Sequence, residues 1–164
     1  MNYLWYVIYT SARAESKVAE RLSLANIQFF YPTLRKLKQW SDRKKWIEEP
    51  LFRSYLFVLI NEKQYFEVLN TPGVVKYVSF GGKAAIVSQR EIDQLKLLIE
   101  GASDLEVIDD FMQPGELVEL IAGPMMGLKG ELVEFRGNSK MAVRVDYLEK
   151  SVLFSVPKNY IRKL

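Results

Sequence analysis

The side chains that could do chemistry in this chain are those of lysine, arginine, the acidic residues, serine and tyrosine, because its 164 residues include no histidine and no cysteine. Histidine is the commonest general base and a common zinc ligand, and disulfides or thiolate metal sites need cysteine. A serine nucleophile would need a lysine or a carboxylate as its base, and no spacing suggests such a pair. We therefore predict a binding protein with no catalytic residue, metal or cofactor.

The densest group of like charges lies between Thr33 and Glu49. Trp40 and Trp46 lie in the same stretch, which contains six cations: Arg35, Lys36, Lys38, Arg43, Lys44 and Lys45. If Ser41-Asp42 is the turn of a hairpin, the two tryptophans should come close across the strands, with the cations around the tip. Cations attract phosphates of any sequence, and indole rings stack on bases. The stretch predicts a nucleic-acid-binding finger, and a solvated charged face is the alternative.

Charge is distributed unevenly along the chain. Residues 1–99 contain 15 Lys and Arg against 9 Asp and Glu, whereas residues 100–164 contain 8 against 11. The net charges are thus +6 and −3, which favour different partners. An acidic stretch with weak periodicity separates the halves, so we predict domains at 1–101 and 113–164 joined by an acidic linker at 102–112.

The first half alternates short apolar runs with amphipathic segments. Ser11 is expected to cap one helix, and capping boxes at Asn61/Gln64 and Ser88/Glu91 predict two more. The apolar runs predict strands at Tyr3–Tyr9, Ile27–Tyr31, Ser54–Ile60, Val74–Val78 and Ala84–Val87. This order predicts an α+β fold, a ferredoxin-like (split βαβ) sandwich with a hairpin insertion.

The second half consists of short strands without intervening helices. They are expected at Leu117–Ile121, Glu131–Phe135, Met141–Val145 and Val152–Val156, which predicts a small SH3-like β-barrel. The first loop follows a ladder of glycines at Gly115, Gly123, Gly127 and Gly130. A phosphate-binding loop would need Gly-Lys-Ser/Thr opening a helix, but a strand follows here, so that interpretation is rejected.

Several motifs resemble, in order, the NusG N-terminal domain and its KOW motif. They are Trp5-Tyr6-Val7, the stretch 49–58, Thr71-Pro72-Gly73-Val74 and the glycine ladder, and together they cover nearly the whole chain. Residues 49–58 and 79–81 resemble specialised antiterminators of the RfaH and UpxY type. The KOW loop, with Gly123, Pro124, Gly127 and Gly130, is instead similar to that of housekeeping members.

The resemblance implies a factor whose N-terminal domain binds the clamp helices of RNA polymerase and promotes processive elongation or antitermination. The residues implied for this patch are Tyr9, Phe52, Tyr55, Phe57 and Phe80. Tyr55 and Phe57 are two positions apart on one strand and so share a face, although strand aromatics are often core residues. The basic finger would face upstream DNA. Arg21, with Lys17 on the same helix, would contact the displaced non-template strand, and an ordinary solvated cation is the alternative for Lys17.

For the KOW domain the resemblance implies a second partner, a small-subunit ribosomal protein or the termination factor Rho. The implied rim comprises Ile121, Met125, Met126, Leu128 and Phe135, although Phe135 is equally a core candidate. Glycines and Pro124 oppose a helix in this domain, which is expected to stay β. Alternatives are a housekeeping factor that modulates pausing and termination, and a KOW-containing RNA-binding protein linked to translation. We expect a cytoplasmic monomer without membrane contact.

Overall fold

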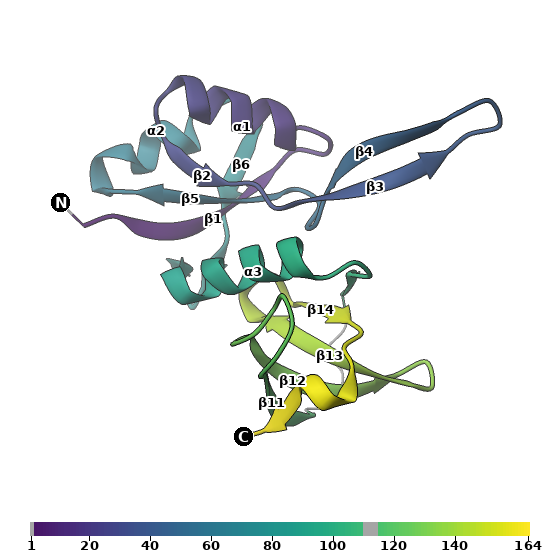
Figure 1. Cartoon of the computed structure of the whole chain (residues 1–164). Helices are drawn as coiled ribbons and strands as arrows, with labels where there is room; N and C mark the ends of the chain where they lie inside the picture. The colour runs from purple at the N-terminus through teal and green to yellow at the C-terminus, as the bar shows by residue number, and fades with distance from the viewer. Residues whose placement is uncertain (1, 110–114) are drawn as a thin grey trace. The chain divides into compact units, whose positions relative to one another are not determined.

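The computed structural model describes residues 2–109 and 115–164, which form two compact units, 1–92 and 93–164 (Figure 1). The boundary falls within helix α3 (Gln89–Gly101), earlier than the boundary expected at residue 101. Part of the predicted linker is strand β10 (Glu106–Ile108), which pairs with β14 (Lys150–Phe154) inside the second unit. The end of that linker and the first two residues of the predicted KOW domain lie outside the described residues.

The first unit is built on an antiparallel sheet with β1 (Leu4–Thr10) near its centre. The strand order is β2-β5-β1-β6, and β9 also pairs with β1; the other strands are β2 (Gln28–Phe30), β5 (Tyr55–Ile60), β6 (Val74–Tyr77) and β9 (Ile86–Val87). Because β5 lies antiparallel between β1 and β2, this is the predicted split βαβ arrangement.

Two helices of the first unit pack their apolar sides on one face of this sheet. Val18 and Leu22 of α1 (Glu15–Leu24) and Val68 of α2 (Tyr65–Leu69) are fully buried in one cluster with sheet residues. The predicted Ser11 cap is wrong, because Ala14 occupies the N-cap and no side chain caps α1. The predicted capping box is present at η1 (Glu62–Gln64), where Asn61 and Gln64 bond reciprocally.

The basic stretch forms a hairpin, as predicted. Strands β3 (Thr33–Gln39) and β4 (Lys44–Pro50) pair at seven positions, and the Trp40 N–H donates to the Arg43 carbonyl at 2.8 Å to close the turn. Figure 1 shows this hairpin projecting beyond the sheet of the first unit. A smaller hairpin pairs β7 (Ser79–Phe80) with β8 (Lys83–Ala84).

The second unit contains a six-stranded antiparallel sheet in the order β10-β14-β13-β12-β11-β15. The strands not yet given are β11 (Glu116–Leu120), β12 (Lys129–Phe135), β13 (Asn138–Val145) and β15 (Ile161–Lys163), and two short turns are η2 (Asp146–Leu148) and η3 (Lys158–Tyr160). All four predicted strands are present. Residues 115–164 contain no α-helix, in agreement with the barrel prediction.

Two glycines of the ladder are required by local geometry. A Cβ atom on Gly130 would lie 2.5 Å from the Ala142 carbonyl oxygen, so β12 and β13 approach there too closely for any side chain. Gly123 has a φ of 82°, and its Cβ would lie 2.6 Å from the Tyr160 ring. The ladder therefore marks a strand contact and a turn of the barrel.

Candidate functional site

Tyr9 and Tyr55 form a half-buried aromatic pair in the first unit. They are register partners on β1 and β5, and their ring centroids lie 5.4 Å apart at an interplanar angle of 61°. The Nζ of Lys76, on β6, lies 5.9 Å from the Tyr9 ring centroid. The predicted patch thus contains two rings that are partly open to solvent, with a cation beside them.

Phe52 and Phe57 are core residues, not the surface residues that the patch interpretation requires. Their side chains are 1% and 0% exposed. Phe57 lies opposite Val7 on one side and Phe30 on the other, and its ring stacks on Phe30 at 5.7 Å. It shares a face with Tyr55 as predicted, but neighbouring strands flank it on both sides. Phe80, in β7, is 73% exposed.

Each tryptophan of the hairpin lies beside at least one cation. The Arg43 guanidinium lies 5.1 Å and the Lys38 amine 5.7 Å from the Trp40 ring centroid, while Arg35 lies 5.1 Å from the Trp46 ring centroid. The prediction that the two indoles come close across the strands is wrong, because the strand register places Trp46 opposite Leu37. Trp46 and Leu37 are both about half exposed, so the finger presents apolar area as well as charge.

Most cations of the hairpin are available to a ligand. Lys36 forms an ion pair with Glu49 at 3.6 Å. Within the described part of the chain, the other five have no carboxylate at ion-pair distance, and all five are exposed: Arg35, Lys38, Arg43, Lys44 and Lys45. Such a group of unneutralised charges attracts a polyanion without regard to its sequence.

The two cations predicted on α1 differ in their contacts. Lys17 is exposed. Arg21 is also exposed, but its guanidinium donates to the Pro72 carbonyl oxygen at 2.8 Å. Because this bond ties the loop after α2 to α1, Arg21 has a structural role in addition to any contact with nucleic acid.

The predicted rim of the second unit divides into exposed and buried residues. Ile121 and Met126 are 45% and 64% exposed. Met125 and Leu128, at 6% and 0%, are core residues, which corrects their expected surface position. Met125 is buried because it packs against Gly101, where an added Cβ would lie 2.4 Å from the Met125 Cγ. Phe135 is half-buried and packs against the core around Val133, Ala142 and Leu153. The exposed Leu117 was not predicted.

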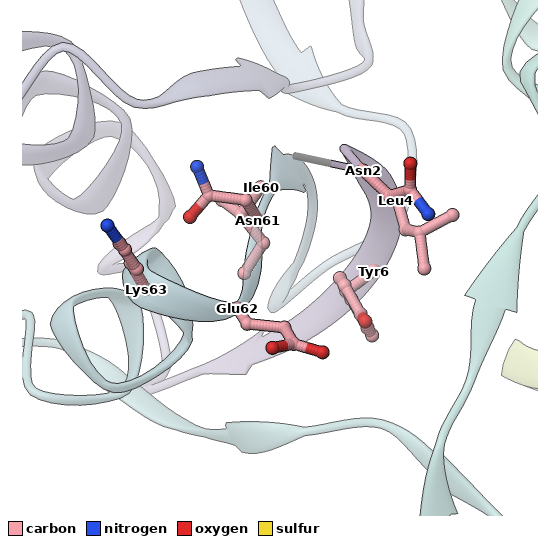
Figure 2. Close-up of a pocket in the computed structure, with 7 residues that line it drawn as sticks. All are labelled: Asn2, Leu4, Tyr6, Ile60, Asn61, Glu62 and Lys63. Atoms are coloured by element: carbon pink, nitrogen blue, oxygen red, sulfur yellow. The ribbon is translucent and has the colours of Figure 1, made fainter.

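A pocket of about 420 Å³ in the first unit contains none of the predicted site residues (Figure 2). It lies where the start of β1 meets the end of β5 and η1, and its lining comprises Asn2, Leu4, Tyr6, Ile60, Asn61, Glu62 and Lys63. The side chain of Asn61 is engaged in its capping box, which leaves few converging polar groups. Nothing in this lining indicates acid–base or nucleophilic chemistry.

Tyrosines beside this pocket are structural. The Tyr77 hydroxyl donates to the Tyr65 carbonyl oxygen at 2.6 Å, and the two rings stack at 4.2 Å. Burial, followed by the neighbouring Tyr65 and Tyr6, raises the pKa of Tyr77. A phenol held neutral in this way is a poor general base.

Two further features were sought in the described residues: clusters of metal-ligating side chains and helices able to span a membrane. Residues 2–109 and 115–164 include no group of three acidic side chains placed to hold a metal ion. No helix in the same residues has both the length and the apolar character needed to cross a bilayer.

Comparisons with known proteins agree with one another. Residues 3–96 match the family described as transcription termination factor nusG. The chain is 30% identical over 146 residues to the transcription termination/antitermination protein NusG of Streptococcus pyogenes serotype M1, covering 82% of each protein. It is 25% identical to the protein of the same name from Staphylococcus carnosus, covering 98% of this chain and 95% of that one.

A solved structure with a similar fold is that reported as "Domain interaction in Thermotoga maritima NusG". It superposes with a TM-score of 0.53 at 23% sequence identity, and the match covers 100% of this chain and 98% of the other. This similarity shows the fold, whereas the family rests on the sequence matches.

Proposed function

The chain belongs to the NusG family of transcription factors, and we propose that it binds the clamp helices of RNA polymerase through its first unit and promotes processive elongation, including antitermination. The observation that carries this proposal is the half-buried Tyr9–Tyr55 pair, with the exposed Phe80 as a further apolar residue. Aromatic residues that are open to solvent in a folded unit are typical anchors of a protein interface. No covalent step belongs to this activity.

The hairpin supports a second contact, with upstream DNA or the displaced non-template strand. Five of its cations are exposed and have no carboxylate partner among the described residues; of these, Arg35 lies over the half-exposed Trp46, and Lys38 and Arg43 lie over Trp40. Cations at such a tip would meet phosphates of the template duplex, while an indole could stack on an unpaired base. Contact with DNA while the first unit holds the polymerase would increase the lifetime of the complex.

The second unit offers an exposed apolar rim for another partner. Ile121 and Met126 remain candidates for contact with this partner, whereas Met125 and Leu128 are buried in the core of the unit. A small-subunit ribosomal protein or the termination factor Rho is the partner that we propose for this rim. A factor joined to a ribosome would couple transcription to translation, whereas one joined to Rho would favour termination.

Affinity purification of the full chain tests the proposed function and its rival. Enrichment of polymerase subunits, lost with Tyr55→Ala but kept with Tyr3→Ala, is the expected result. Tyr3 is a suitable control because it is 53% exposed and precedes β1. Enrichment of ribosomal RNA without polymerase would replace the proposal by an RNA-binding role linked to translation. A transcription assay with purified polymerase then separates reduced pausing from increased termination.

A further inference from the structure

A groove in the second unit shares no residue with the predicted rim. It has a volume of about 380 Å³ and lies where β11, β12 and the start of β13 meet the segment that leads into β15. Its apolar lining comes from Val118, Leu132, Val156 and Ile161. Ser139, whose hydroxyl donates to the Glu134 carboxylate at 2.6 Å, and three lysines complete the lining: Lys140, Lys158 and Lys163.

The lysines leave positive charge at this groove. Across residues 2–109 and 115–164, neither Lys140 nor Lys158 has a carboxylate within ion-pair distance. Lys163 lies 3.4 Å from Glu116, but both side chains are more than half exposed, and such pairs are weak. An anionic ligand would therefore meet two unpaired ammonium groups and a third that can change partner.

The chemistry around the groove favours an acidic peptide over a nucleic acid. Its apolar lining is aliphatic, whereas proteins that bind single strands stack bases on aromatic rings. Residues 100–164 also have a net charge of −3, which opposes the approach of a long polyanion. A short acidic segment would interact electrostatically mainly with the nearby lysines, because solvent ions screen charges more than about 10 Å away.

We propose that this groove binds an acidic segment of a partner protein, with an aliphatic side chain against Leu132 and Ile161 and carboxylates beside Lys140 and Lys158. Apolar contact supplies affinity, and charge complementarity selects the partner and speeds association. The site differs from the polymerase surface and from the rim at Ile121 and Met126, so the chain could hold this segment together with its other partners.

The test uses the full chain and a fluorescein-labelled hexapeptide with two central leucines and two acidic residues on each side. We expect saturable binding that Lys140→Glu with Lys158→Glu weakens by about tenfold or more, as for a reversal of close interface charges. Lys129→Glu is the matched control, because Lys129 is exposed on β12 and does not line the groove. Methyl NMR should show the peptide shifting signals of Leu132 and Ile161.

Three outcomes would overturn the proposal. They are no saturable peptide binding to the wild type, equal binding to the double variant, and larger shifts of the same methyl signals with an oligouridine of matched charge. The last outcome would assign the groove to RNA. Polymerase binding by the double variant, measured in parallel, keeps this result separate from the proposed function.

Discussion

Tyr9 and Tyr55 face each other across β1 and β5, with ring centroids 5.4 Å apart in an edge-to-face arrangement. This geometry places the positive edge of one ring near the negative face of the other. Each ring therefore helps to hold its partner while both remain partly open to solvent. The two positions should be coupled: replacing one tyrosine is expected to change how much the other contributes to the free energy of unfolding.

Replacing Tyr55 should separate binding from folding. We expect Tyr55→Ala to lower affinity for RNA polymerase by roughly 30-fold, the effect of losing an interface anchor worth about 2 kcal/mol. Titration of labelled polymerase measures this loss, and unchanged affinity in the folded variant would remove Tyr55 from the interface.

Phe57→Ala should act on stability instead, because Phe57 is fully buried and stacks on Phe30. We expect the free energy of unfolding to fall by about 3–5 kcal/mol, as for other buried phenylalanines. Urea unfolding of the wild type and the variant measures this change in the free energy of unfolding. A change below about 1 kcal/mol would contradict the core position of this ring.

Removing cations at the hairpin tip should flatten the salt dependence of DNA binding. We expect Arg43→Ala, Lys44→Ala and Lys45→Ala each to reduce the slope of log affinity against log salt by about 0.7–0.9. The reason is that each phosphate contact releases counterions when it forms. Lys63→Ala, which removes an exposed cation from η1, serves as the control. A slope equal to that of the wild type would leave the hairpin as a solvated charged face.

Adding a methyl group at Gly130 should destabilise the second unit. The new Cβ would lie 2.5 Å from the backbone carbonyl oxygen of Ala142, so the paired strands must move apart. We expect Gly130→Ala to cost about 1–3 kcal/mol, the range for overpacked positions. Thermal unfolding followed by methyl signals of residues 115–164 measures the change. Lys129→Ala, one position earlier on β12, should have a much smaller effect.

Acid should loosen the pairing of β10 with β14. The hydrogen bond from Lys150, together with its charge, lowers the pKa of Asp109. Because the folded pKa lies below the unfolded one, the contribution of this carboxylate is present at neutral pH and disappears as the pH falls through the folded pKa. Amide exchange at 106–108 should therefore show less protection near pH 3 than near pH 6, which brackets the usual carboxyl range. Asp109→Asn should reduce that difference, and an unchanged difference would assign it to other groups.

Local sequence patterns predicted those features whose causes are local. The turn at Ser41-Asp42, the Ser88/Glu91 capping box and most predicted strands each depend on residues a few positions apart, and these are present. The predicted strand Ala84–Val87 is instead divided between β8 and β9, which pair with β7 and β1. The same patterns could not predict how deeply a side chain is buried in the folded protein. Alternation indicates which face of β5 carries Phe57, but its burial also involves residues distant in sequence, such as Phe30 of β2, on which its ring stacks.

Contacts between distant residues explain the remaining differences. Met125 is buried because it packs against Gly101, which no motif around Met125 reveals. Strands β10 and β15 have three residues each, too few for a period to be recognised. They exist through pairing with β14 and β11, so an acidic stretch that resembles a linker can become a strand.

The hairpin of β3 and β4 forms a two-stranded sheet, and no third strand pairs with it among the described residues. Its outer edges carry unpaired backbone N–H and C=O groups, which can recruit an identical edge from another molecule. Because the hairpin carries five exposed unpaired cations, two copies repel each other before such edges can join. We therefore expect the lysines and arginines to oppose self-association, so that a variant with a neutral finger should aggregate at concentrations where the wild type stays dispersed.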